Sequence, residues 1–105
     1  MSFNYGWEKF YLAIRFGLGS SGTVQERLKA VISGVSHLSA DNFPDEQNWN
    51  EFRELLHETT KHPAQGGEGT IEATTSRMTD EEAEKCLDKA FDIFSDIARA
   101  YGRES

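Results

Sequence analysis

Glu54 and His57 are the residues whose spacing comes closest to that of a known chemical site. A Glu-x-x-His pair sets two metal ligands on one face of a helix, as in di-iron helical bundles. Such a site needs a second pair and two further inward carboxylates, which this sequence does not supply. Glu54 and His57 also lie opposite the apolar stripe of their own helix, so we expect them to face water. We therefore predict neither a metal site nor a bound cofactor.

Cys86 is the only cysteine, and it lacks the surroundings of a catalytic thiol. A nucleophilic cysteine needs a base and positively charged neighbours, whereas Glu82 lies one helical turn away. We interpret His37 and His62 as surface or capping residues rather than as bases. A single cysteine also excludes an internal disulfide and a four-cysteine zinc site, which favours a reducing, cytoplasmic compartment. We predict no catalytic residue and no enzymatic activity.

A glycine- and threonine-rich loop, expected over residues 63–78, is the third candidate; within it, residues 70–78 are interpreted as loop or as a short helical turn. Its glycines Gly66, Gly67 and Gly69 do not match a Walker phosphate loop, because no lysine follows them. Arg77 stands beside several hydroxyl side chains, and its guanidinium can hold an anion or a partner's carboxylate. The residues that we predict for ligand binding are Gln65, Thr74, Thr75 and Arg77. The other interpretation of the loop is a flexible connector.

Apolar periodicity predicts an all-α protein in which four helices position these residues. The expected helices cover residues 5–18, 23–39, 44–61 and 79–102. Capping boxes predict two of the helix starts, one at Thr23 with Glu26 and one at Thr79 with Glu82. The pattern favours one domain over residues 1–105, an antiparallel four-helix bundle with the long loop before its last helix.

The first expected helix is apolar on two faces. Six of the twelve aromatic residues of the chain lie within its first sixteen positions. Trp7 and Ile14 belong to one face, while Leu12 and Phe16 lie one turn apart on the opposite side. The second face is either buried in the same domain or part of a protein interface, of which a homodimer is the commonest form. The residues that we predict for an interface are Leu12, Phe16, Phe3 and Tyr5.

Charge is unevenly distributed along the chain. Eleven Lys and Arg residues oppose eighteen Asp and Glu residues, and the net charge of −7 argues against direct binding to nucleic acid or anionic membranes. An acidic ridge is expected on the last helix, formed by Asp80, Glu81, Glu84, Asp88 and Asp92. The ridge is interpreted either as a solvated face that maintains solubility or as a docking surface for a basic partner.

The apolar residues near the N-terminus do not predict a targeting segment. A signal peptide has a basic start before its apolar run, but Glu8, Lys9 and Arg15 fall within or beside this run. No uninterrupted apolar stretch approaches the length of a membrane span. We expect a cytoplasmic protein that does not bind membranes.

Four short blocks of the sequence are similar to those of a group of short bacterial proteins that are usually labelled uncharacterised. The blocks are Trp7-Glu8-Lys9-Phe10, Gln25-Glu26-Arg27-Leu28, Gln65-Gly66-Gly67-Glu68-Gly69 and Met78-Thr79-Asp80-Glu81-Glu82-Ala83. The resemblance implies a small, stand-alone bacterial cytoplasmic protein, and it brings no activity, ligand or catalytic residue. It also implies that residues 65–83 are a feature of the group.

Three functional hypotheses follow. The leading one is a non-enzymatic protein–protein interaction module, such as an adaptor, an inhibitor or an antitoxin-like regulator, that buries Leu12 and Phe16 against a second copy or an unknown protein partner. The alternative is a bundle that binds a small ligand or an anion in a pocket formed by the 65–78 loop, Arg77 and the N-terminal aromatic residues. The third is an acidic mimic of nucleic acid that blocks a nucleic-acid-binding protein.

Overall fold

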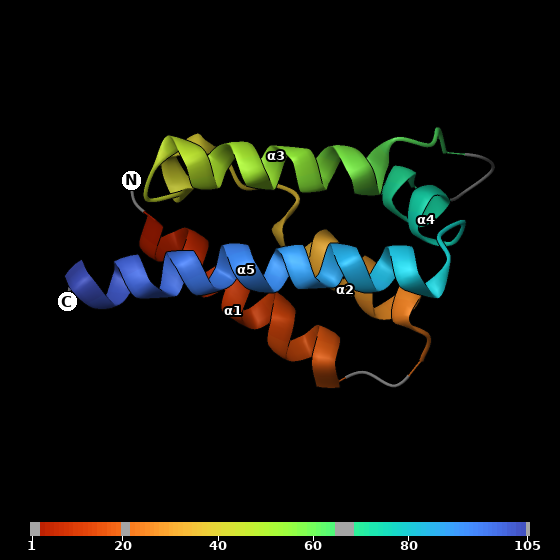
Figure 1. Ribbon diagram of the computed structural model, residues 1–105, viewed down its shortest axis with the longest axis horizontal. Coiled ribbons are helices and arrows are strands. Elements are labelled where there is room, and N and C mark those ends of the chain that lie inside the picture. The colour runs from red at the N-terminus through yellow and green to blue at the C-terminus, as the bar shows by residue number, and fades with distance from the viewer. Residues whose placement is uncertain (1–2, 20–21, 65–68, 105) are drawn as a thin grey trace.

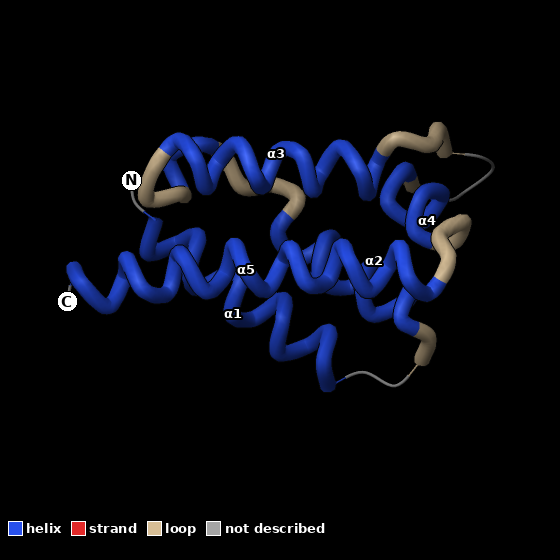
Figure 2. Tube along the Cα trace, viewed as in Figure 1, coloured by secondary structure: helices blue, strands red, loops and turns tan. Residues whose placement is uncertain are grey.

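The computed structural model describes residues 3–19, 22–64 and 69–104, and the regular structure within these ranges is entirely helical (Figure 2). The helices of these ranges are α1 (Phe3–Gly19), α2 (Val24–Val35), the 3-10 turn η1 (Ala40–Asn42), α3 (Glu46–Thr60), α4 (Thr70–Thr75) and α5 (Asp80–Glu104). The all-α class expected from the apolar periodicity is confirmed.

Capping boxes begin α2 and α5, as predicted. At α2, the Glu26 carboxylate accepts a hydrogen bond from the Thr23 backbone N–H at 2.9 Å, and the Thr23 hydroxyl accepts one from the Glu26 N–H at 3.1 Å. Thr79 and Glu82 repeat both bonds at α5, at 2.9 and 3.1 Å. These bonds, above all the one from the backbone N–H, hold the pKa of both glutamates below its usual value.

Among the expected boundaries that differ from the structure, two have a clear local cause. The second helix ends at Val35 rather than at residue 39, and the chain reaches the buried Leu38 through a turn that leads into η1. The third helix begins after Pro44, because Asp45 is its N-cap and accepts a hydrogen bond from the Asn48 N–H at 2.8 Å. In both places a local side-chain or turn hydrogen bond sets the helix boundary. The spacing of apolar residues cannot predict such bonds.

The expected 63–78 loop contains a fifth helix, α4. Ala73, Thr74 and Thr75 are all buried there, and α4 packs against α2 and α3. The Thr74 hydroxyl donates to the Thr70 carbonyl at 2.8 Å and accepts from the His62 backbone N–H at 3.0 Å. Burial and these hydrogen bonds stabilise a helix whose threonine-rich sequence has a weak helical propensity of its own.

Figure 1 shows α3 and α5 side by side and running in opposite directions, with α4 at one end of the pair. Helices α1 and α2 pack against each other and against α5. The buried face of α5 repeats at intervals of three and four residues, and it consists of Ala83, Cys86, Ala90, Ile93, Ile97 and Ala100. Many of these side chains are small, so the neighbouring helices can approach α5 closely.

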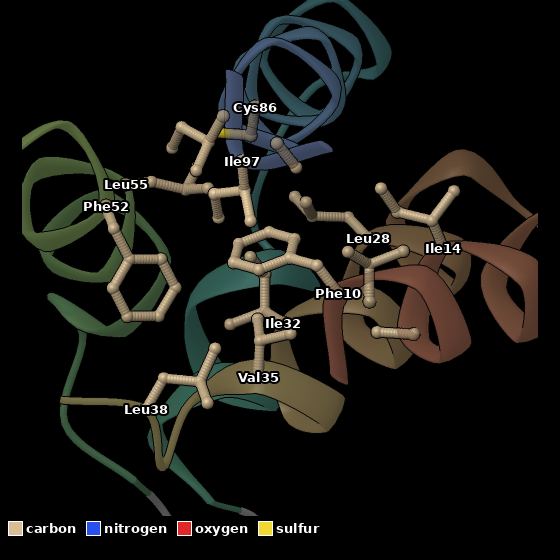
Figure 3. Close-up of a cluster of buried hydrophobic side chains, with 14 of the residues drawn as sticks. Phe10, Ile14, Leu28, Ile32, Val35, Leu38, Phe52, Leu55, Cys86 and Ile97 are labelled. Atoms are coloured by element: carbon tan, nitrogen blue, oxygen red, sulfur yellow. The ribbon is translucent and has the colours of Figure 1, made fainter. Parts of the chain in front are cut away.

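The core lies where these helices meet (Figure 3). Phe10 extends from α1 into its centre, between Phe52 of α3 and Ile32 of α2. The rings of Phe10 and Phe52 pack edge to face, with centroids 5.7 Å apart and an interplanar angle of 73°. All three side chains are fully buried, and each such burial stabilises the fold by about 1.5–3 kcal/mol.

Crossing a membrane requires a long helix that is apolar over most of its length. None of the described helices combines the necessary length with an apolar composition over that length. The long helix α5 carries both acidic and basic residues along its exposed face, so it is not apolar over its length.

Candidate functional site

A groove of about 850 Å³ lies between α3 and α5, close to the end occupied by α4. Arg53 and His57 line it from α3, and Lys61, the C-cap of that helix, follows at the same interval of four residues. Lys85 and Lys89 line it from α5, also four residues apart. Because residues at this interval share one face of a helix, each helix presents a basic row to the groove. We refer to this feature as the α3–α5 groove.

The α3–α5 groove is basic, although the protein as a whole is acidic. Five Lys and Arg side chains line it against three Glu side chains, in a chain with a net charge of −7. Two of the three carboxylates are already engaged: Glu58 pairs with Lys61 at 3.3 Å, and Glu82 caps α5. The lining cations are exposed, and the groove lining carries a formal excess of two positive charges in a chain whose net charge is negative.

Cys86 forms part of the groove wall, and its thiol is unsuited to nucleophilic chemistry. The residue is 8 % exposed. Burial, followed by the nearby Glu58 carboxylate, raises the pKa of the thiol above its ordinary value. The group is therefore protonated at neutral pH, whereas attack requires the thiolate. Cys86 is a buried free thiol, as the sequence predicts.

The residues predicted for ligand binding in the loop have different positions. Thr74 and Thr75 are 1 % and 2 % exposed, and Gln65 lies outside the described residues. Arg77 lines the α3–α5 groove and donates a hydrogen bond to the Ala73 carbonyl. Thr75 therefore serves the packing of α4, while Thr74 and Arg77 reach the rim of the groove.

Within the described ranges, Arg77 and the N-terminal Trp7 lie at opposite ends of α5, which does not fit a pocket shared by Arg77 and this aromatic residue. Trp7 stacks on Tyr101 with ring centroids 4.8 Å apart, near the C-terminal end of α5. Arg77 precedes the other end of the same helix, and the rise along α5 separates the two by about 30 Å. The sequence places Arg77 just before α5, but it does not show which end of α5 Trp7 meets.

Glu54 and His57 are both exposed and both line the α3–α5 groove, in agreement with the expectation that they face water. Within the described ranges, no three His, Cys, Asp or Glu side chains gather as a metal site requires. The basic rows on α3 and α5 were not predicted as a site. Their signal in the sequence is the four-residue spacing of Arg53, His57 and Lys61, which identifies a shared helix face but not its neighbour.

A second surface of interest follows α1, and we call it the α1 stripe: Tyr5, Lys9, Leu12 and Phe16. Tyr5 is 43 % and Phe16 70 % exposed, and Leu12 is half-buried. The Lys9 ammonium lies 5.2 Å from the centre of the Tyr5 ring, a cation–π distance. The Tyr5 hydroxyl lies 3.1 Å from Nε2 of His37. Phe3 begins α1, and its side chain lies outside the part that the structure describes.

The acidic ridge predicted on α5 is exposed throughout. Its members are Asp80, Glu81, Glu84, Asp88 and Asp92, all of which face solvent. This placement agrees both with a solvated helix face and with a docking surface for a basic partner. The hypothesis that the ridge mimics nucleic acid therefore stays a prediction.

No protein-family model matches this chain, and neither the curated proteins nor the solved structures contain a match. A function is therefore inferred from the α1 stripe and the α3–α5 groove, whose chemistry departs from that of an ordinary solvated helix face. The α1 stripe exposes aromatic side chains, whereas the groove gathers basic side chains in an acidic protein.

Proposed function

We propose that this protein is a non-enzymatic protein–protein interaction module, an adaptor, inhibitor or antitoxin-like regulator, that self-associates through the α1 stripe. The observation that supports this function is the 70 % exposure of Phe16, beside Leu12 and Tyr5 on one face of α1. Full burial of a phenylalanine side chain contributes about 1.5–3 kcal/mol, and for Phe16 most of that gain is available only through association. The scaffold in this proposal is an antiparallel four-helix bundle of α1, α2, α3 and α5.

A second copy of the chain is the partner that the charges beside the stripe favour. Glu8 and Arg15 are exposed, and helical spacing puts both on the same flank of the α1 stripe. In an antiparallel pair of α1 helices related by a two-fold axis, the same flanks meet. Glu8 of each copy then lies opposite Arg15 of the other, and two equivalent ion pairs form.

The aromatic residues of the stripe fit the same pairing. Tyr5 and Phe16 lie at its two ends, about 16 Å apart along the helix axis. An antiparallel pairing brings Tyr5 of one copy against Phe16 of the other and leaves Leu12 near the two-fold axis. A parallel pairing would oppose identical residues and separate the charged flanks, so the antiparallel arrangement is the one that we propose.

We also propose that the module acts in the cytoplasm. The support is its single cysteine, a buried free thiol, which suits a reducing compartment. The four-block resemblance to small bacterial proteins implies the same location.

A double substitution in the stripe tests the proposed function. Leu12→Glu with Phe16→Glu brings charges into the interface, and we expect a dimer to become a monomer in sedimentation equilibrium over a range of concentrations. The control is Gln47→Glu with Ser95→Glu, which adds the same charge at exposed positions of α3 and α5. Helical circular dichroism should match the unmodified protein in both variants. A monomeric unmodified protein, or equal dissociation of the control, contradicts the proposal.

A charge exchange tests the antiparallel register separately. Glu8→Arg alone, or Arg15→Glu alone, brings like charges together across the two-fold axis, and each should weaken association. The combined variant restores opposite charges and should recover the association constant of the unmodified protein. Additive losses in the combined variant would reject this register. Because both side chains are exposed, none of the three variants is expected to disturb the fold.

A further inference from the structure

We propose that the α3–α5 groove binds an oligophosphate, a linear anion with several phosphate groups. This binding site is separate from the α1 stripe and does not depend on self-association. The volume of about 850 Å³ lies within the range of roughly 300–1,000 Å³ that small-molecule sites occupy. Its lining is dominated by charged side chains, so the groove suits a charged ligand rather than an apolar one.

The spacing of the basic residues favours an extended anion over a single phosphate. Arg53 and Lys61 are eight residues apart, or about 12 Å along α3, and Lys85 and Lys89 are about 6 Å apart along α5. Because α3 and α5 run in opposite directions, the two rows face each other along the groove. Lys61 and Lys85 both lie near Glu82, so the two basic rows come close together at the end of the groove next to α4. One phosphate cannot contact cations distributed over this length.

The cations available to a ligand outnumber the available carboxylates. Within the described ranges, no ion pair of 4.0 Å or less joins a carboxylate to Arg53, Lys85 or Lys89. Glu58 is paired with Lys61, and the α5 capping box engages a second lining carboxylate. The capping bond leaves the negative charge of Glu82 in place, so the lining as a whole carries five Lys and Arg side chains against three Glu side chains. Arginine and lysine donate charge-assisted hydrogen bonds to phosphate oxygens, and arginine can donate two at once.

The neighbouring surface limits the site to this part of the α3–α5 junction. A second hollow of about 570 Å³ shares Glu54 and Lys89 with the groove and continues along the same helices. Its lining adds Glu51, Asp92 and Asp96, so carboxylates outnumber cations there. An anion is repelled from that end and is confined to the basic rows.

Titration calorimetry at low ionic strength tests the site with inorganic tripolyphosphate, and orthophosphate serves as the single-phosphate comparison. We expect tripolyphosphate to bind at a ratio of one per chain, at least about tenfold more tightly than orthophosphate, with an affinity that falls as salt is added. ATP is a third ligand in the test. Similar affinities for ATP and tripolyphosphate assign the ligand to free oligophosphates, whereas tighter binding of ATP assigns it to nucleotides.

A charge-matched pair of variants tests the location. Arg53→Gln with Lys89→Gln removes one cation from each row, and we expect tripolyphosphate affinity to fall by at least about tenfold. Lys29→Gln with Arg103→Gln removes the same charge outside the groove, and its affinity should change by less than about twofold. Lys85→Gln is a single, exposed substitution that keeps the test valid if the first double variant fails to fold. Absence of tripolyphosphate binding, or equal losses in the two double variants, overturns the proposal.

Discussion

Phe10 and Phe16 are the same residue type on the same helix, yet they have opposite environments. Phe10 is fully buried and packs edge to face against Phe43 and Phe52, with ring centroids 6.3 and 5.7 Å away. Phe16 is 70 % exposed. The difference shows that hydrophobicity alone does not assign a side chain of α1 to the core. Its angular position relative to α2, α3 and α5 does.

The buried face of α1 is also the more tightly packed. A Cβ atom added at Gly6 would collide with the backbone carbonyl of Asn42, because α1 touches η1 at that point. On the exposed face, an added Cβ at Gly19 meets no atom within 4 Å. The two faces should therefore respond very differently to the same substitution, and the following predictions are ordered from the largest expected effect to the smallest.

Phe10→Ala should have the largest effect. Removing this ring from the centre of the core leaves a cavity, and the free energy of unfolding should fall by about 3–5 kcal/mol. Phe16→Ala is the matched control, and for the monomer its effect should lie within about 0.5 kcal/mol. Urea unfolding at a low protein concentration measures both values. Comparable losses at the two positions would show that Phe16 is a core residue and would remove the basis of the proposed interface.

Gly6→Ala should have the second largest effect. The new methyl group forces α1 and η1 apart, and such overpacking reduces the free energy of unfolding by about 1–3 kcal/mol. Gly19→Ala adds the same methyl group in open space, where the reduced freedom of the unfolded chain should leave stability unchanged or raise it by up to about 1 kcal/mol. Thermal unfolding of the two variants and of the unmodified protein measures both changes in stability. A stable Gly6→Ala variant would mean that α1 and η1 do not approach as closely as described.

The smallest expected effect concerns Cys86, a buried titratable side chain. Its burial should make the free energy of unfolding depend on pH. Its pKa is raised in the folded state, mainly by burial, from an ordinary value of 9.0. The folded state then holds its proton more tightly than the unfolded state. This contribution to stability is complete below the unfolded-state pKa and is lost as the pH rises through the folded-state pKa.

The measurement for Cys86 is urea unfolding at several pH values from neutral to alkaline. The Cys86→Ala variant lacks the thiol contribution, so its free energy of unfolding should decline less steeply above pH 9.0. The slope is compared rather than the absolute stability, because the substitution also changes packing. Parallel curves for the two proteins would show that the thiol is not titrated differently in the folded and unfolded states.

Much of the secondary structure could be predicted because its causes are local. The capping boxes at Thr23 and Thr79 act within four residues, and both formed. The two faces of α1 follow from helical geometry, which separates Phe10 from Phe16 before any neighbour is known. Helix α4 could be predicted only as one of two alternatives, a loop or a short helical turn over residues 70–78, because its threonine-rich sequence is stabilised by burial of Thr74 and Thr75 against other helices.

The candidate surfaces divide in the same way. Tyr5, Leu12 and Phe16 of the α1 stripe were predicted from the sequence, because a stripe belongs to one helix and follows from its periodicity, whereas Lys9 was not. The α3–α5 groove was not predicted, because Arg53 and Lys89 come from helices whose pairing depends on long-range packing. Arg77 was predicted as an anion ligand, but Trp7, one of its expected aromatic neighbours, lies at the far end of α5.

The sequence by itself determined the helical class, the two capping boxes, the buried periodicity of α5 and the apolar character of both faces of α1. These features depend on interactions between residues a few positions apart. Only the tertiary structure decided that α4 forms, that η1 presses against Gly6 and that basic rows from α3 and α5 face one groove. Each of those features requires two distant segments to meet, and the free energy that brings them together comes from burying apolar surface throughout the core.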